Sequence, residues 1–228
     1  MNFEEIYRRD WHNFIKFHTE HAGLSNPLLL AGPDNYYGQK VKLFVVGQQT
    51  NSWYPSTKID QDSGSIERLQ KNYLEFELGL IYRSPFWDAI RRLEDILGIE
   101  ENQILWSNLN RVDQNKMRPL KAIEEELADR FAWLPAEMHS AKPDLVVFLT
   151  VPQYDSNILT HFKNAQFNRV GAWPDRQLAR VEHQALPKFS YRTYHPGYFK
   201  RSGQWEEMLE IFEGIRKQYQ RDYKPKNF

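Results

Sequence analysis

Four short runs of apolar residues, rich in β-branched side chains, punctuate the chain. They cover residues 41–46, 103–108, 144–149 and 189–194. The first and third runs are the most continuously apolar, which is typical of strands buried on both faces of a parallel sheet. The pattern therefore predicts four short strands, separated by longer segments with a different period.

Those longer segments carry apolar residues at the spacing of amphipathic helices. One helix begins near Phe3, another spans 66–80, a third region spans 123–134, and the last helix runs over about 205–219. Pro135 is expected to kink or divide the third of these segments, because proline disrupts a helix interior.

One further helix is delimited at both ends by its sequence. Ser84 suits the N-cap, Pro85 the first helical position and Gly98 the C-terminal stop. The apolar stripe between them runs from Ile90 to Leu97. This segment is therefore the helix with the best defined boundaries.

The alternation of strands and helices predicts a single α/β domain over residues 1–228. Parallel strands need long crossover connections, so we expect a mainly parallel, four-stranded sheet with helices on both faces. Ligands of such sheets bind beyond the carboxyl ends of the strands. The residues that follow the four strands should therefore meet in one crevice. They are 47–54, 108–113, 150–154 and 195–201.

The charge and cysteine content of the chain limit which binding partners and which cellular compartment can be expected. Lysine plus arginine number 30, as do aspartate plus glutamate, so DNA binding would need a local basic patch. Without cysteine the chain has no disulfide, iron–sulfur cluster or thiol nucleophile. The apolar runs are too short to cross a bilayer, and the first residues lack the pattern of a signal peptide. We therefore expect a cytoplasmic protein with no membrane partner.

The loop after the first strand is rich in hydrogen-bonding groups. Gly47 lets a ligand approach the backbone, and Gln48, Gln49, Thr50 and Asn51 supply amides and a hydroxyl. The aromatic pair Trp53 and Tyr54 follows. This loop suits a planar polar ring.

The loops after the second and fourth strands add further candidates. Asn108 and Asn110 carry amides that can read the edge of a base with a donor and an acceptor together. His195, fixed by the turn Pro196-Gly197, can donate to a developing negative charge. Two cations that can hold phosphates follow this turn, and they are Lys200 and Arg201.

Taken together, these residues resemble the motifs of the uracil-DNA glycosylase superfamily over positions 41–201. Gly47-Gln48 is similar to the start of the family's Gly-Gln-Asp-Pro loop, Asn108 to its base-reading asparagine, and His195-Pro196 to its His-Pro-Ser motif. The resemblance implies a three-layer α/β/α fold and an enzyme that flips a damaged base out of DNA and hydrolyses its glycosidic bond.

The resemblance also implies roles for the neighbouring residues. Trp53 or Tyr54 becomes the stacking partner of the base, while Tyr198 and Phe199 become the apolar wedge that fills the gap left by the flipped base. Gln48 joins His195 as a candidate catalytic residue.

Two departures from the family pattern bear on the chemistry. Gln49 stands where the family has its catalytic aspartate, and Gly197 replaces the motif serine. Some relatives use an asparagine to orient water, so Asn51 is a candidate substitute from a shifted position. Asp113 and Asp155, which follow the second and third strands, are candidates for the missing carboxylate.

Other clusters favour structural roles. His18 and His21 lack a third metal ligand at motif spacing, and Asp60 and Asp62 lack the later carboxylate of an EF-hand loop. No metal or other cofactor is therefore expected. The chain also has no phosphate-binding loop, dinucleotide fingerprint or nucleophile elbow.

Three functions remain open at this point. The first is a DNA glycosylase that acts, as a monomer, on a modified base such as uracil in single- or double-stranded DNA. The second is a nucleobase or nucleic-acid binder that kept the pocket and lost the aspartate. The third is a protein-interaction module on the same fold.

Overall fold

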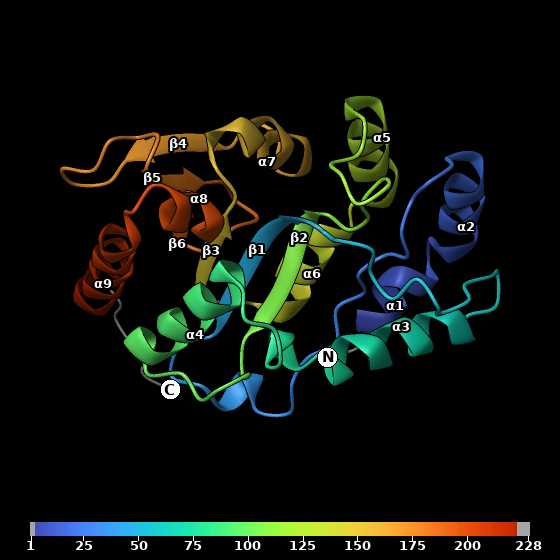
Figure 1. Ribbon diagram of the computed structural model, residues 1–228, viewed down its shortest axis with the longest axis horizontal. Coiled ribbons are helices and arrows are strands. Elements are labelled where there is room, and N and C mark those ends of the chain that lie inside the picture. Colours follow the sequence, from blue (N-terminus) through green and yellow to red (C-terminus); the bar gives the residue numbers. More distant parts are fainter. Residues whose placement is uncertain (1–2, 223–228) are drawn as a thin grey trace.

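One mixed sheet of six strands runs through the computed structural model, which describes residues 3–222 (Figure 1). Its strand order is β2-β1-β3-β6-β5-β4. The four parallel strands are β1 (Leu43–Gln49), β2 (Leu105–Asn110), β3 (Leu145–Leu149) and β6 (Phe189–Thr193). The prediction of an α/β protein is thus confirmed, and each predicted parallel strand is present.

The prediction of only four strands is wrong. β4 (Gln166–Arg169) and β5 (Leu178–Glu182) form an antiparallel pair that extends the sheet beyond β6. Three of the four residues of β4 are exposed. This edge strand therefore lacks the run of apolar residues by which the other strands were predicted. Polar side chains on an edge strand are a common protection against pairing with other chains.

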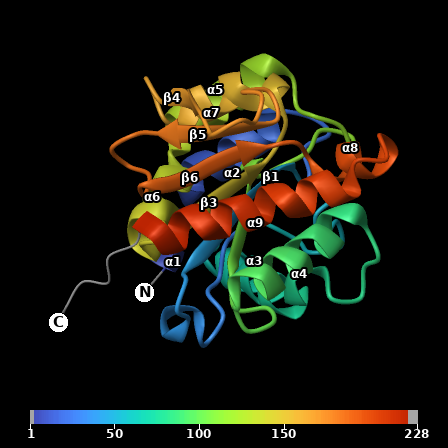
Figure 2. The same cartoon turned by 90° about the vertical axis from the view of Figure 1, so that its left-hand side faces the viewer.

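Helices cover both faces of the sheet. α4 (Pro85–Leu97), α8 (Pro196–Arg201) and α9 (Trp205–Asp222) pack together on one face, where α9 crosses in front of β3 and β6 (Figure 2). On the opposite side lie α1 (Phe3–Arg8), α2 (Trp11–Glu20), α5 (Lys121–Phe131) and α6 (Trp133–Ala141). The remaining α-helices are α3 (Gly64–Glu75), which contacts α1, and α7 (Asp155–His161), which contacts α5.

The helix signals in the sequence are borne out at α4. The Ser84 hydroxyl accepts a hydrogen bond from the Trp87 amide at 3.4 Å, and Gly98 ends the helix with a φ of 67°. The segment before Pro135 is divided as expected, but the break lies at Ala132, which has a φ of 42°. Pro135 itself lies in the first turn of α6, where a proline is tolerated.

A buried polar network joins the N-terminal helix to the main body. Arg111 and Tyr7 both donate hydrogen bonds to the carboxylate of Glu137 on α6. The Tyr7 hydroxyl accepts from the Leu30 amide at 2.8 Å, and Arg111 donates to the Leu28 carbonyl at 3.0 Å. These bonds fix the segment around residues 28–30, which precedes β1, between α1 and α6.

Replacing Arg111 tests this network. Arg111→Met leaves the Glu137 carboxylate buried without its cation, so we expect the free energy of unfolding to fall by about 3–5 kcal/mol. Lys163→Met removes an exposed ion pair with Asp129 at 3.0 Å and should cost less than about 1 kcal/mol. Urea denaturation measures both variants, and equal losses would contradict a special role for the network.

Candidate functional site

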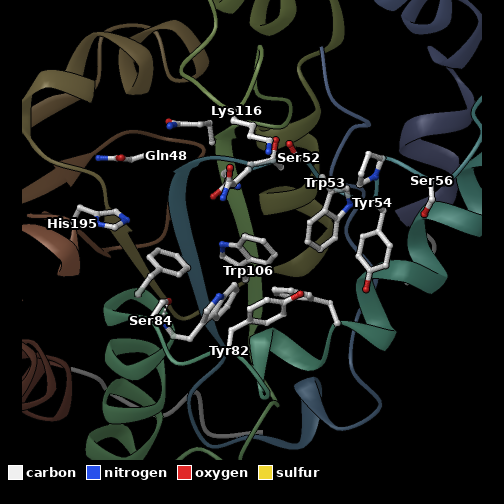
Figure 3. A pocket seen from close by; sticks show the side chains of 18 residues that line it. Gln48, Ser52, Trp53, Tyr54, Ser56, Tyr82, Ser84, Trp106, Lys116 and His195 are labelled. Carbon is white, nitrogen blue, oxygen red and sulfur yellow. Dashed lines mark hydrogen bonds between the residues drawn. The ribbon is translucent and has the colours of Figure 1, made fainter. Parts of the chain in front are cut away.

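A cavity of about 730 Å³ opens at the carboxyl ends of β1, β2 and β6 (Figure 3). Its size lies within the range of about 300–1,000 Å³ that is usual for small-molecule sites. The wall combines amides, hydroxyls, aromatic rings, one lysine and one histidine. The lining residues are Gln48, Gln49, Thr50, Asn51, Ser52, Trp53, Tyr54, Pro55, Ser56, Phe76, Tyr82, Ser84, Phe86, Trp87, Trp106, Asn108, Lys116 and His195.

The predicted crevice is therefore present, although the four loops contribute unequally. The loop 48–54, Asn108 and His195 all line it. Residues 150–154 support the first loop instead of lining the cavity. The Gln48 side chain donates to the Thr150 carbonyl at 2.9 Å, and the Tyr154 hydroxyl donates to Gln49 Oε1 at 2.7 Å.

Gly47 is required by the close packing of two other side chains. It lies opposite Asn108 in the parallel register of β1 and β2. A Cβ atom at this position would overlap Asn108 Oδ1 and would lie 3.1 Å from the Phe86 ring. The missing side chain thus makes room for two residues of the cavity wall, and Gly47 itself does not line the cavity.

Asn108 presents an unused hydrogen-bond donor. The residue is only 2% exposed, and its Nδ2 has no hydrogen-bond partner among the described residues. A buried amide without a partner is costly, and most such groups in proteins are satisfied. Because Asn108 lines the cavity, this buried donor without a partner lies in the cavity wall.

Asn110 has a different environment. Its amide donates to Glu124 Oε1 of α5 at 2.6 Å, and the residue does not line the cavity. Of the two asparagines predicted to contact a base, only Asn108 lines the cavity. Asn108 is therefore the candidate for hydrogen bonding to a ligand.

The His195 ring has a defined orientation and tautomer. Nδ1 accepts a hydrogen bond from the Gly197 amide at 3.0 Å, so in the neutral ring the proton is on Nε2. The ring stacks on Phe86 with a centroid distance of 5.5 Å and projects toward the cavity (Figure 3). Burial, with a smaller contribution from the Arg201 charge, lowers the pKa of His195 from 6.5 to about 4. His195 is therefore a neutral hydrogen-bond donor at physiological pH.

The aromatic wall centres on Trp106, which was not among the residues predicted to form the site. Trp106 lies two residues before Asn108 on β2, so both side chains leave the same face of the strand. Its ring contacts those of Trp53 at 5.7 Å, Trp87 at 4.8 Å and Phe76 at 5.8 Å. The two-residue spacing from Asn108 was the available signal for placing this tryptophan in the site.

Asp113 shapes the first loop from outside the cavity. Its Oδ2 accepts from the Thr50 hydroxyl at 3.0 Å and from the Ser52 amide at 2.6 Å, and its Oδ1 accepts from the Lys116 amide at 2.7 Å. Ser52 has a φ of 54°, a backbone conformation that costs energy and needs such support. Asp113 thus positions the two loops that carry Asn51 and Lys116.

Neither candidate for the missing carboxylate reaches the cavity. Asp113 is committed to the contacts above, and Asp155 pairs with Arg192 at 2.9 Å. Within residues 3–222, the cavity lining contains no aspartate or glutamate. Lys116 contributes a positive charge at the rim and forms no ion pair with a described residue.

The segment after His195 departs from its predicted role. Phe199 is completely buried under α8, so the prediction that it forms part of a wedge is wrong. Tyr198 is exposed and packs on Tyr194 with a centroid distance of 4.6 Å. Lys200 and Arg201 are also exposed, although the Lys200 ammonium lies over the Trp205 ring at 5.5 Å. None of these residues lines the cavity.

The remaining polar clusters have structural partners. His18 Nε2 contacts the Ser25 carbonyl at 3.1 Å, and His21 lies 3.5 Å from Glu126. Asp60 accepts from the Asp62 amide at 3.0 Å and from the Ser65 hydroxyl at 2.8 Å, which closes the turn before α3. The described part of the chain contains no group of three or more metal-ligating side chains, and no helix in it is long and apolar enough to span a membrane.

An NMR titration of the histidine rings tests the state of His195. We expect its resonance to titrate with a midpoint near pH 4, and the ring to remain neutral at pH 6–8. Arg201→Ala should move the midpoint upward, since it removes a nearby positive charge. A wild-type midpoint near 6.5 would show that the ring is solvated rather than buried.

A search of protein-family models and of curated proteins finds no match to this chain. Functional assignment therefore depends on the geometry of the cavity and on the motifs Gly47-Gln48, Asn108 and His195-Pro196.

Proposed function

We propose that this protein is a DNA glycosylase-type hydrolase that binds an extrahelical modified base in the cavity. The observation that carries the proposal is the presence of two hydrogen-bond donors in one aromatic-lined cavity. These are the unpartnered Asn108 amide and the Nε2–H of neutral His195. The resemblance of their motifs to the uracil-DNA glycosylase superfamily supports the same function.

The cavity has the chemistry that a planar, polar ring requires. The rings of Phe86, Trp53 and Trp106 offer apolar surface on which a base can stack. The Asn108 side chain carries both a donor and an acceptor, so it can pair with a carbonyl and a neighbouring N–H on the edge of a base. Uracil and hypoxanthine both present such an edge.

His195 can stabilise the base as it leaves the sugar. When the bond between C1′ and the base nitrogen breaks, its electron pair passes to the base and spreads onto a carbonyl oxygen. A fixed Nε2–H donor stabilises this anion more strongly than it stabilises the neutral base. A neutral imidazole retains its proton during the step. The water oxygen forms the new bond at C1′, and the proton that this water loses passes through solvent to the base anion.

The cavity lining of residues 3–222 offers the attacking water no carboxylate base, and the Lys116 ammonium there cannot accept a proton. The amide oxygen of Asn51 can orient a water by accepting one of its hydrogens, but an amide cannot remove the proton as a carboxylate can. The reaction therefore depends on stabilisation of the leaving group, which favours bases that form stable anions.

The lack of a carboxylate favours one alternative function. A protein with the same cavity can bind an extrahelical base or a free nucleobase without cleaving the glycosidic bond. This alternative predicts binding to single-stranded or lesion-bearing DNA, with strong salt dependence and no strand break after alkali.

A base-release assay separates the two functions. The substrates are oligonucleotides that contain uracil, hypoxanthine, xanthine or hydroxymethyluracil. We expect the wild-type protein to release at least one of these four bases. His195→Ala should lower the rate about 10²- to 10³-fold, as expected for loss of a donor to a developing anion, while DNA affinity changes little.

His12→Ala is the matched control, because His12 is an exposed histidine on α2 that does not line the cavity. It should leave the rate unchanged. Binding without release from any of these substrates would reject the hydrolase and favour the binder, whereas the absence of both would reject nucleobase recognition.

A further inference from the structure

An exposed apolar tip stands beside the cavity, in the connection between α3 and α4. Leu80, Ile81 and Tyr82 are 42%, 83% and 52% exposed. Tyr82 also lines the cavity, and Ser84, two residues later, lines it as well. The tip is therefore part of the cavity rim.

The backbone around this tip is held in an unusual shape. The three preceding residues, Glu77, Leu78 and Gly79, all have positive φ values of 46°, 47° and 66°. Hydrogen bonds then close the turn, from the Leu80 amide to Glu77 at 3.0 Å and from the Tyr82 amide to Gly79 at 2.8 Å. Such conformations are strained for non-glycine residues and persist where the surroundings enforce them.

Contacts on both sides of Ile81 fix its position without covering it. The Tyr82 ring packs on Phe76 with a centroid distance of 5.3 Å, and Arg91 donates to the Tyr82 carbonyl at 3.2 Å. On the other side, Leu78 is buried in the core. A large apolar side chain is thereby exposed to solvent on a fixed support.

Two cations that form no ion pair in the described part of the chain lie around the same rim, where the turn also carries the exposed carboxylate of Glu77. Arg83, which follows the tip, is exposed and forms no ion pair with any residue in 3–222. Lys116, also without an ion pair in that range, lies at the rim of the same cavity. Arg83 beside the apolar tip and Lys116 across the cavity from Tyr82 (Figure 3) can contact the phosphate backbone of a bound DNA.

We propose that Ile81 is the wedge that enters duplex DNA and fills the gap left by the flipped base. This inference rests on the proposed base-binding function and assigns the wedge to the α3–α4 connection. The segment after His195 offers less, because Phe199 is buried and Tyr198 is packed on Tyr194. Ile81 is a positioning residue, since it acts on the DNA stack and not on the reacting bond.

The proposal is tested with DNA that already contains the gap, so the identity of the substrate base does not matter. The probe is a DNA duplex in which a tetrahydrofuran abasic site lies next to 2-aminopurine. The strand that carries both groups, without its complement, serves for comparison. Ile81→Ser should weaken binding to the abasic duplex about tenfold and reduce the change in 2-aminopurine fluorescence, because a stacking contact is lost. Binding to the single strand should stay within about twofold.

Two variants serve as controls. Ile81→Phe keeps a large apolar side chain and should restore binding to the abasic duplex. Leu159→Ser removes an exposed apolar side chain of α7, outside the cavity, and should behave as wild type.

Equal losses on duplex and single strand, or no loss on either, would overturn the wedge. A change in the oligomeric state of Ile81→Ser would also overturn it, because the tip would then be a protein interface. The base-release assay on single strands tests the proposed function separately. A single strand has no base stack in which a flipped base leaves a gap, so base release from it does not depend on the wedge.

Discussion

The parallel register of β1 and β2 is the constraint on which the site depends. It places Gly47 directly opposite Asn108, and the absence of a side chain at Gly47 gives space to the Asn108 amide and the Phe86 ring. Phe86, on α4, in turn stacks on His195, which follows β6. A slip of one residue would reverse the faces of β2 and remove Asn108 and Trp106 from the cavity.

Support for this arrangement comes from polar groups that never touch the cavity. Asp113 holds the first loop through the Thr50 hydroxyl and the Ser52 amide, and Thr150 holds Gln48. The buried pair of Arg111 and Glu137 fixes the chain that leads into β1. Because Asp113, Arg111 and Glu137 each have several partners, the loop can keep a strained backbone while its outer residues remain open to a ligand.

The parallel strands, the capped helix α4 and the positions of Asn108 and His195 could be predicted from local patterns. Continuous apolar runs locate buried strands, and topology then brings the ends of parallel strands together. Within the aromatic wall, Trp106 could be placed by its two-residue spacing from Asn108. Phe76 and Phe86 could not be predicted, because they come from other elements and meet Trp106 only through packing. The burial of Phe199 was missed for the same reason, since nothing within the segment 198–201 shows which side of α8 faces the core.

In the proposed function, Asn108 and His195 together form hydrogen bonds with the polar edge of one nucleobase. The most direct measurement is an NMR titration of isotope-labelled protein with free uracil and hypoxanthine, following the Asn108 side-chain amide and the His195 Nε2–H. We expect both resonances to shift together, with the same saturation curve. Shifts confined to the surface around Lys200 and Arg201, or saturation of one resonance without the other, would contradict it.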